Sequence, residues 1–350
     1  MKVTTIGIDL AKTVFQVHGV DQHGTPVIKK QLKRHQMAEY FVNLEPCLIG
    51  MEACGGAHHW ARKLQSMGHT VRLIAPQYVK PYVKSQKNDA ADAEAICEAV
   101  ARPNMRFVAV KHVDQQSVLA LHVARAGFVK ARTALSNQIR GLLAEFGVVV
   151  PKGLSHMATR VPELLEDASN ELTGMVRLLI QGLLEQLKNL DVLAKKLERQ
   201  IKGWSRQSTE AQRIEQVPGI GPITATALVA SLGDVRCFED GRQVSAWLGL
   251  VPRQHSSGGK TVLLGITKRG DSYLRTLLIH GARSAILAAQ KKKDGPPAWL
   301  ASLLARKHPN VAAVALASRN ARIVWALLSH QRDYDPRHGQ DKRLGGAVPA

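Results

Sequence analysis

Four acidic residues stand at positions from which a fold could bring their carboxylates into one cluster. Asp9 ends the apolar run VTTIGID, and Glu52 ends the apolar run CLIGME. Asp89 and Asp92 lie three residues apart at the start of the helical stretch DAADAEAICEAV, so they project from one face of a helix. Because like charges repel, such a cluster needs a counter-charge, and hard divalent cations prefer oxygen ligands. The pattern predicts a metal site for phosphodiester chemistry, in which two ions clamp the attacking and leaving oxygens.

Each of these residues also has a simpler interpretation. An aspartate at a strand end is more often a turn or cap residue, and Asp89 could serve as the N-cap of its helix. The run GIDLAKT is similar to the first phosphate loop of actin-like ATPases, but the sequence lacks the further Gly-rich loops that such a site requires. His58 and His59 follow Glu52 closely, yet adjacent histidines on a helix point in different directions. We therefore do not expect joint metal binding, and we interpret one of the two histidines as a helix-packing residue or a nucleic-acid contact.

The charge of the chain indicates its partner. The 350 residues carry a formal net charge of +20, and the isoelectric point is about 10.1. Residues 241–350 hold 18 Lys and Arg against five Asp and no Glu, which supplies +13 of the total. An excess of this size indicates a polyanion, most simply DNA or RNA, with a merely solvated basic surface as the alternative. The C-terminal third is therefore the expected grip on a phosphate backbone.

The remaining composition argues against several classes of protein. Cysteines occur at 47, 54, 97 and 237 without CxxC spacing, so no zinc or redox motif is expected. The N-terminus reads as a strand and not as a signal peptide, and no apolar run reaches about 18 residues. We expect a cytoplasmic protein that does not span a membrane.

The elements that must position the acids follow from periodicity. Residues 3–9, 14–20 and 26–32 predict three strands, with a turn at DQHGTP between the second and third. The pattern then alternates, with strands at 47–51, 70–75 and 106–110 and helices at 36–44, 57–67, 76–86 and 89–101. Three strands followed by this alternation predict a mixed sheet with helices on it, in the order of an RNase H-like α/β domain over residues 1–111.

A helical region is expected over residues 112–208. One long helix covers 112–146 and ends at Gly147 and Pro151, and a second runs from about 171 to 205. The second helix has apolar residues at alternating steps of three and four, which is a coiled-coil seam. These residues are Ile180, Leu183, Leu187, Leu190, Ala194, Leu197, Ile201 and Trp204. The seam fits either packing against helix 112–146 in the same chain or pairing between chains.

Residues 209–333 form the last predicted domain, which is mainly helical. The run VPGIG at 217–221 precedes an Ala-rich helix at 222–232, as in a helix-hairpin-helix. The backbone amides of Gly219 and Gly221 could there meet a phosphate, although a plain helix–helix turn is the alternative. The tail 334–350 mixes Gly, Pro and charge and is expected to be disordered.

A second chemical group lies in the run RQHSSGGK at 253–260. Ser256 and Ser257 stand on a Gly-rich loop between Arg253 and Lys260, and further cations follow at Lys268, Arg269 and Arg275. A serine becomes a useful nucleophile when it is deprotonated or metal-assisted, and nearby cations stabilise a charged phosphoryl transition state. Alone, this pattern is more typical of an ordinary Ser-Gly loop.

The motifs taken together resemble the DEDD-type insertion-sequence transposases, which are recombinases guided by a bridge RNA. They appear in family order over roughly residues 1–330 as GIDLAK, MEACGGAHHWAR, KNDAADAEAI, LLAEFG, VPGIG, LGLVPRQHSSGG and TKRGDSYLRTLLIHGAR. The resemblance implies a RuvC-like N-terminal domain whose four acids are Asp9, Glu52, Asp89 and Asp92. It also implies that Ser257, which precedes the first Gly of the SG motif, is the nucleophile, with Ser256 the lesser candidate.

The resemblance further implies a composite site in which Ser257 attacks a DNA phosphate with help from metal held by the acids. It implies DNA and a guide RNA as partners, and a homo-oligomer, dimer or tetramer, whose protomers could share the site. Our hypothesis is an RNA-guided DNA recombinase, associated with the bacterial nucleoid, that moves its own insertion element with Mg²⁺ or, alternatively, Mn²⁺. One alternative is a metal-dependent nuclease or Holliday-junction resolvase with a structural serine. The other is a nucleic-acid-binding protein without activity.

Overall fold

The chain divides into two compact units. In the computed structural model, the described residues are 2–84 and 88–336. One unit comprises residues 1–113 together with 232–237, and the other comprises residues 114–231 and 238–350.

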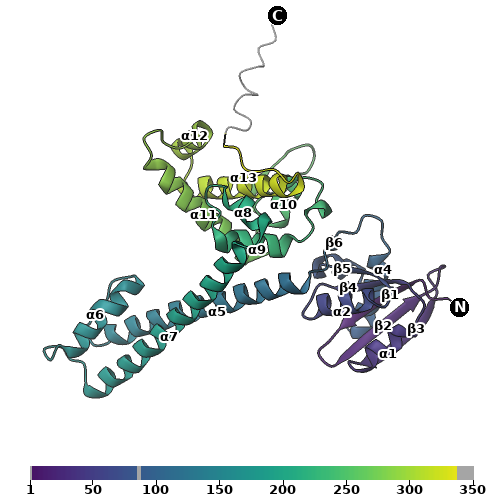
Figure 1. The fold of residues 1–350 in the computed structure, drawn as a ribbon, viewed down its shortest axis with the longest axis horizontal. Helices are drawn as coiled ribbons and strands as arrows, with labels where there is room; N and C mark the ends of the chain where they lie inside the picture. The colour runs from purple at the N-terminus through teal and green to yellow at the C-terminus, as the bar shows by residue number, and fades with distance from the viewer. Residues whose placement is uncertain (1, 85–87, 337–350) are drawn as a thin grey trace, which may run out of the picture. The chain divides into compact units, whose positions relative to one another are not determined.

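A six-stranded mixed sheet forms the centre of the first unit. Its strand order is β3-β2-β1-β4-β5-β6 (Figure 1). Strands β1 to β3 form an antiparallel meander, β4 and β5 run parallel to β1, and β6 is antiparallel to β5. The strands are β1 (Thr5–Leu10), β2 (Val14–Val20), β3 (Pro26–Lys33), β4 (Leu48–Glu52), β5 (Thr70–Ile74) and β6 (Phe107–Val108). This mixed α/β sheet is consistent with the predicted RNase H-like fold.

Helices cover both faces of the sheet because the strands alternate buried side chains between two cores. Ile6 and Ile8 of β1 pack with Phe15 of β2 in the core that also contains side chains of α1 (Gln36–Val42) and α2 (Ala57–Gln65). The opposite face is covered by α4 (Asp89–Val100), which packs on β1, β2, β4 and β5. In β1, the residues that alternate with Ile6 and Ile8 therefore lie on the face that α4 covers.

Two predicted elements of this unit are shorter than expected. The helix predicted at 76–86 is a four-residue helix, α3 (Pro76–Val79), followed by a 3₁₀ turn at Lys80–Tyr82. Pro81 lacks a backbone N–H, and its ring clashes with the preceding turn, so the α-helix cannot continue. Residues 85–87 of that prediction lie outside the described residues. The strand predicted at 106–110 is confined to Phe107–Val108.

Two long antiparallel helices form an arm of the second unit (Figure 1). Helices α5 (Val113–Ala144) and α7 (Gly174–Ser205) are joined through α6 (Leu154–Glu166), which the sequence did not predict. Arg125 pairs with Glu198 at 2.6 Å, and Arg132 of α5 pairs with Asp191 of α7. From the first pair to the second, the residue number in α5 rises by seven and the residue number in α7 falls by seven, so the two helices run antiparallel.

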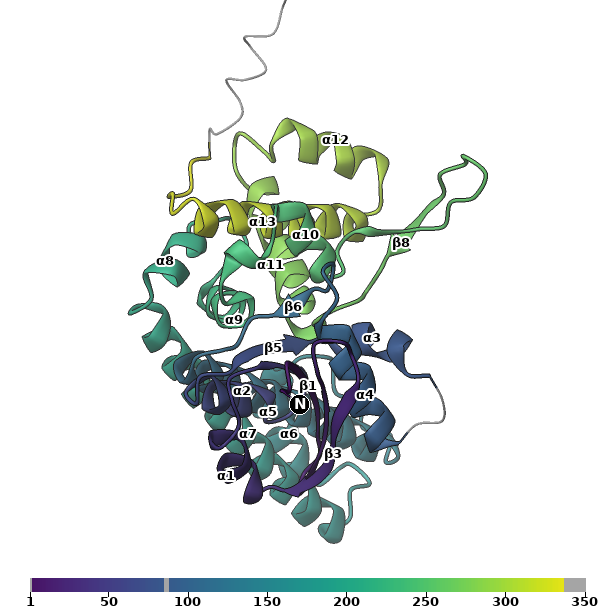
Figure 2. The same ribbon diagram turned by 90° about the vertical axis from the view of Figure 1, so that its right-hand side faces the viewer.

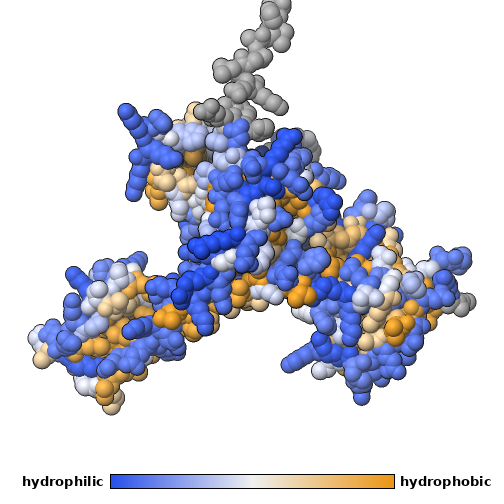
Figure 3. All heavy atoms as spheres, in the orientation of Figure 1, coloured by the Kyte–Doolittle hydropathy of each residue, from blue (hydrophilic) through white to orange (hydrophobic). Residues whose placement is uncertain are grey.

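The seam of α7 faces inward within the chain. Ile180, Leu187, Ala194 and Ile201 are fully buried or nearly so, and the first two share a core with α5 and α6. Packing within one chain, one of the two alternatives, is therefore present. The arm also exposes apolar side chains, as the orange atoms in Figure 3 show. These include Val123, Val149, Met175, Leu178 and Leu179.

The rest of the second unit is mainly helical, as predicted. It contains α8 (Thr209–Glu215), α9 (Pro222–Leu232), α10 (Gly241–Trp247), α11 (Ser272–Gln290), α12 (Ala298–Arg306) and α13 (Pro309–Ser329). A hairpin is formed by β7 (Pro252–Gln254) and β8 (Leu263–Ile266), and a 3₁₀ turn at Val235–Cys237 belongs to the first unit. From residue 337 on, the predicted disordered tail lies outside the described residues.

Helix α13 is the central helix of this domain. It packs against α8, α10, α11 and α12, and Ala313, Ala317 and Val324 are fully buried. By length and composition α13 is also apolar enough to cross a membrane. The core helix of a soluble protein passes the same test, and the buried residues of α13 lie in the core of this domain.

Candidate active site

Asp9 lies on the face of the sheet that α4 covers. Side chains alternate along a strand, so Asp9 shares a face with Gly7. Gly7 directly abuts the helix, because a Cβ added there would lie 2.2 Å from the carbonyl oxygen of Ala93. Asp92 immediately precedes Ala93. The first turn of α4 therefore lies towards the same end of β1 as Asp9.

Glu52 reaches the same face from the neighbouring strand. Gly7 pairs with Gly50 in the parallel β1–β4 ladder, and a Cβ at Gly50 would lie 2.7 Å from Cβ of Val100 in α4. Glu52 is two residues beyond Gly50, so it also faces the helix side. The pKa of the Cys54 thiol is raised, first by burial and then by the negative charges of Glu52 and Asp9. Both carboxylates therefore lie close to one thiol.

Asp89 and Asp92 belong to the first turn of α4, but neither caps it. The N-cap is Asn88, whose side-chain oxygen accepts a hydrogen bond from the backbone N–H of Ala91 at 2.8 Å. The interpretation of Asp89 as the N-cap was therefore wrong. Both carboxylates lie near the positive end of the helix dipole. Asp89 is exposed and Asp92 is half-buried.

The structure brings the four acids to one end and one face of the sheet. Among the described residues, however, no three His, Cys, Asp or Glu side chains are grouped closely enough to hold a metal ion. The donor set is nevertheless all carboxylate, which is the chemistry that a hard divalent cation requires. The residues fit such an ion by type and by face.

The adjacent histidines do not add to this donor set. His58 Nδ1 accepts from the backbone N–H of Lys111 at 3.2 Å, and Nε2 lies 3.1 Å from Lys111 Nζ. Burial and then the charges of Lys111 and Arg62 lower the pKa of His58 to about 4. His59 is exposed and contacts the ring of Trp60 edge-on. The prediction that the two rings point apart is confirmed, and His58 is a packing residue.

Ser257 stands at the first position of a tight turn in the β7–β8 hairpin. The backbone N–H of Lys260 donates to the carbonyl oxygen of Ser257 at 3.0 Å. Gly258 and Gly259 have φ values of +53° and +77°, so the turn is of type I′, which requires positive φ at both central residues. The two glycines therefore fold the loop sharply directly after the serine.

The hairpin extends away from the helices of its own unit (Figure 2). Residues 252–265 are all exposed, including Arg253 and Lys260 on either side of the serines. The Ser256 hydroxyl accepts a hydrogen bond from the Gln254 side-chain amide at 2.9 Å. Of the two neighbouring serines, Ser256 is thus engaged within the loop, while Ser257 is exposed beside the turn.

The root of the hairpin is fixed by backbone contacts. The Arg275 guanidinium Nη1 donates to the carbonyl oxygens of Leu248 and Arg269, at 3.1 and 3.0 Å. Gly270 has a φ of +79°, and a Cβ there would lie 1.9 Å from the carbonyl oxygen of Trp247. Arg275, predicted to bind nucleic acid, therefore anchors the hairpin root in this structure.

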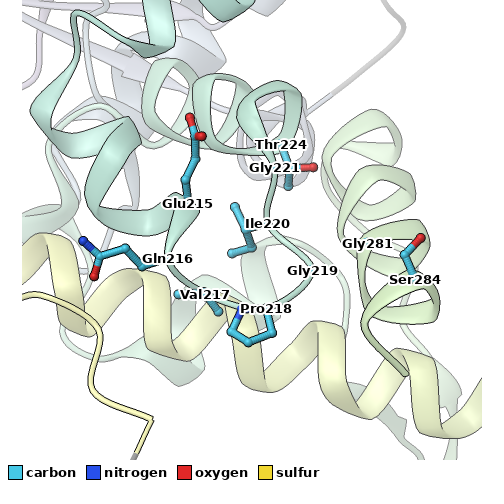
Figure 4. A pocket seen from close by; sticks show the side chains of 10 residues that line it. All are labelled: Glu215, Gln216, Val217, Pro218, Gly219, Ile220, Gly221, Thr224, Gly281 and Ser284. Atoms are coloured by element: carbon cyan, nitrogen blue, oxygen red, sulfur yellow. The ribbon is translucent and has the colours of Figure 1, made fainter. Parts of the chain in front are cut away.

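The VPGIG turn joins α8 to α9 and lines an open cavity of about 430 Å³ (Figure 4). Gly219 has a φ of +92°, and its backbone touches that of α11 so closely that a Cβ would lie 2.7 Å from the carbonyl oxygen of Gly281. The Asn320 side chain of α13 donates to the Pro218 carbonyl oxygen at 2.9 Å. The turn is thus held against α11 and α13. Gly221 also lines the cavity.

A buried polar chain that the sequence did not reveal connects α5, α9 and α11. Thr226 Oγ1 donates to the Pro222 carbonyl oxygen at 2.7 Å, so it accepts from His122 Nε2 at 2.9 Å. His122 Nδ1 then accepts from the Tyr273 hydroxyl at 3.0 Å. His122 is a lone histidine in a helix of Ala, Leu and Arg, and no spacing singled it out. These hydrogen bonds link the first turn of α11, which lies next to the hairpin root, to α5.

Acid should destabilise the protein through His122. Its pKa is lowered to about 4, first by burial and then by the charge of Arg125. The unfolded chain therefore binds this proton near pH 6.5 and the folded chain only near pH 4. The free energy of unfolding should fall across that window, by about 3 kcal/mol at its acid end. Urea unfolding at several pH values measures this dependence. Between pH 4 and pH 6.5, the free energy of unfolding of His122→Asn should vary with pH less steeply than that of the wild type, by the equivalent of one proton. Equal pH dependence in the two proteins would contradict this role.

Comparison with known proteins agrees with this geometry. A mixed sheet with four acids at one end, in a chain whose remainder is mostly helical, is consistent with a DEDD-type transposase with an RNase H-like domain. The family model of the DEDD transposase of IS110 elements matches residues 6–147. The model described as "Transposase IS116/IS110/IS902 family" matches residues 211–294.

Similar proteins extend the match to nearly the whole chain. A "probable family 20 transposase" of Pseudomonas aeruginosa is 52% identical over 337 residues, covering 96% of this chain and all of that protein. The transposase for insertion sequence element IS1111A of Coxiella burnetii is 45% identical, covering 95% of this chain and 91% of that protein. The transposase for IS1328 of Yersinia enterocolitica is 42% identical, covering 93% and 96%.

The chain therefore belongs to the IS116/IS110/IS902 family of insertion-sequence transposases. The resemblance seen in the sequence motifs is confirmed at this level, which implies that the protein cuts and rejoins DNA. The DEDD domain implies a divalent metal ion, and the carboxylates at the α4 face have the donor chemistry to bind one.

Proposed function

We propose that this transposase is an RNA-guided DNA recombinase that breaks and rejoins DNA through Ser257, assisted by a divalent metal ion bound to the four acids. The observation that supports it most is the placement of Asp9, Glu52, Asp89 and Asp92 on one face and at one end of the sheet. The exposure of Ser257 on a hairpin supports its access to a DNA phosphate.

The proposed chemistry is a balanced exchange of phosphodiester bonds. The Ser257 hydroxyl loses its proton as its Oγ attacks a DNA phosphorus, and the P–O bond to one sugar breaks. The departing sugar oxygen takes up a proton, which leaves a phosphoserine and a free DNA hydroxyl. In the second step, a hydroxyl of another strand attacks the phosphoserine, and Ser257 leaves as the protonated alcohol. Neither step needs an external oxidant or nucleotide, because the number of phosphodiester bonds is conserved.

The acids would hold Mg²⁺ or, alternatively, Mn²⁺. A bound ion of this kind activates an attacking oxygen and neutralises charge on the leaving oxygen. Asp9 and Glu52 would approach it from the ends of two adjacent parallel strands, and Asp89 and Asp92 from the first turn of α4. A carboxylate cluster without a cation is electrostatically unfavourable, so the ion would also stabilise the site.

Nucleic acid would be held by exposed cations and backbone amides. Arg253, Lys260, Lys268 and Arg269 are exposed around the hairpin, and they can contact phosphates. We interpret α8, the VPGIG turn and α9 as a helix-hairpin-helix that presents Gly219 and Gly221 to a backbone. Base pairing by a guide RNA would supply the choice of sequence, so the protein needs only contacts to backbones and shape.

The proposed domain organisation follows from these roles. Residues 1–111 form the RuvC-like catalytic domain, residues 112–208 a helical coiled-coil region and residues 209–333 the domain with the serine. The apolar side chains exposed along α5 and α7 support contact with a second copy, as a dimer or tetramer. Protomers could then share acids and serine, and the protein would act in the cytoplasm on nucleoid DNA.

One observation favours a second function, that of a metal-dependent nuclease or Holliday-junction resolvase. Ser257 occupies the first position of a turn, where a serine can be retained for the turn alone. In that case the acids would cut DNA with water as the nucleophile, and no covalent intermediate would form.

Asp9→Asn should abolish DNA cleavage because it removes one carboxylate charge from the metal-binding group while keeping the size of the side chain. We expect cleavage of element-end DNA in Mg²⁺ to fall by at least about a hundredfold, and Asp92→Asn should act similarly. Glu39→Gln makes the same chemical change on the exposed surface of α1 and should leave cleavage unchanged. Full cleavage by the Asp9 and Asp92 variants would contradict catalysis by the four acids. Absence of cleavage in the wild type as well would support a binding protein with an inactive nuclease fold.

A further inference from the structure

The edge strand β3 carries cations on the same face of the sheet as Asp9. Lys29 pairs with His18, and Lys33 pairs with Val14, in the β2–β3 ladder. His18 in turn pairs with Gly7, whose missing side chain would point at α4. Residues directly opposite in a ladder share a face, so Lys29 and Lys33 lie on the α4 side.

The opposite face of β3 packs against the core formed with α1 and α2. Leu32 is buried in the core beneath α1 and α2, and Lys30 Nζ lies 4.9 Å from the ring centroid of Tyr40 in α1. Alternation therefore sends Lys29 and Lys33 away from that core. The pKa of His18 is lowered, first by burial, with the charge of Lys29 also contributing, which places Lys29 near this α4-facing histidine.

The two lysines flank a row of polar residues that leads to the acids. Asp9 pairs with Gln16 of β2, and Gln16 pairs with Gln31 of β3. Strands are about 4.8 Å apart, so Gln31 is roughly 10 Å from Asp9 across the sheet. Along β3, Lys29 and Lys33 lie on either side of Gln31, each about 7 Å from it. The row forms a short polar path from the edge strand to the carboxylates.

These side chains are open to a ligand. Lys29, Gln31 and Lys33 are exposed, and α4 packs on β1, β2, β4 and β5. Within residues 2–84 and 88–336, no carboxylate pairs with Lys29 or Lys33. Two ammonium groups about 14 Å apart, on either side of an amide, suit an extended polyanion, because each can neutralise one phosphate.

We propose that Lys29, Gln31 and Lys33 form a phosphate-binding strip that holds the backbone of the DNA strand beside the four acids. The inference rests on the proposed function, because that function places a scissile DNA phosphate at Asp9. A nucleic-acid backbone fits the strip better than an apolar partner does, since its exposed side chains are cationic or amide. The strip would supply position and affinity without sequence readout.

The test compares DNA binding by full-length variants with neutralised lysines. In Lys29→Gln/Lys33→Gln, affinity for a fluorescent DNA duplex should fall about tenfold, and the slope of log affinity against log salt should decrease by about two. Lys30→Gln is the control for the position of the charge, because it removes one positive charge from the same strand on the opposite face. Lys29→Arg/Lys33→Arg should retain wild-type affinity.

The possible outcomes separate this inference from the proposed function. Equal DNA affinity and salt slope in the double glutamine variant and the wild type would overturn the strip. A loss restricted to a fluorescent RNA hairpin, with DNA binding unchanged, would also overturn it. If wild-type protein does not cleave DNA in Mg²⁺ but the lysine variants still bind DNA more weakly, the catalytic proposal fails and the strip stands.

Discussion

Ser257→Ala should eliminate the covalent protein–DNA link. The variant lacks the oxygen that attacks phosphorus in the first step of the proposed exchange, so strand exchange should fall by roughly a thousandfold or more. The measurement is a denaturing gel of end-labelled element DNA incubated with protein and Mg²⁺. Wild-type protein should retard a fraction of the label as a protease-sensitive adduct, and the variant should give none.

The neighbouring serine is a close control. Ser256→Ala removes a hydroxyl that bonds Gln254 within the loop, and it leaves the turn formed by Gly258 and Gly259 in place. We expect adduct formation to persist in this variant. Undiminished cleavage by Ser257→Ala without any adduct would instead support the nuclease or resolvase alternative. An adduct lost only in Ser256→Ala would show that the nucleophile had been assigned to the wrong residue.

The sheet could be predicted from the sequence because its strands have a strong period. In β2, Phe15 and Val17 alternate with Gln16, and the structure has the predicted bounds of 14–20. The same alternation predicts that Asp9 faces away from Ile6 and Ile8. Periodicity states which face a residue occupies, but it does not state which strands are neighbours. The adjacency of Asp9 and Glu52 therefore depends on the parallel β1–β4 pairing.

Two elements of the second unit were not predicted from the sequence. Helix α6 contains Pro162 and follows Gly153, so its local signals favoured a loop. The β7–β8 hairpin is exposed on nearly every residue and shows no alternation of buried and exposed side chains. Its strands are specified by the Gly258–Gly259 turn and by the fixed root, including the Arg275 contacts. Such contacts are tertiary, and a one-dimensional pattern does not contain them.

The two halves of the candidate site differ in how far sequence could assign them. The acids are predicted by type, by strand end and by helical spacing, and the structure gathers them on one face. Ser257 is about 165 residues from Asp92 and belongs to the other unit. No local period links them, so only the family resemblance joined the serine to the acids.

Gly7→Ala should destabilise the first unit and also displace two of the four acids, Asp89 and Asp92 of α4, from the other two. The added Cβ would lie 2.2 Å from the Ala93 carbonyl oxygen and 2.3 Å from the Cys97 backbone nitrogen. Both atoms belong to the backbone of a helix, so rotation of a side chain cannot relieve the contact. Overpacking of this kind should lower the free energy of unfolding by about 3 kcal/mol or more. A shift of α4 away from β1 would relieve the clash, and it would also move Asp92 away from the strand that carries Asp9.

Thermal denaturation and cleavage in Mg²⁺ measure the two effects in the same protein. Gly55→Ala is the control, because a Cβ there would meet no atom within 4 Å. It should leave the melting temperature unchanged, so the difference between the variants reports the contact of β1 with α4. A Gly7→Ala protein with wild-type melting temperature and cleavage would mean that α4 does not rest on Gly7. The placement of Asp92 at the same end of the sheet as Asp9, on which the carboxylate site depends, would then be wrong.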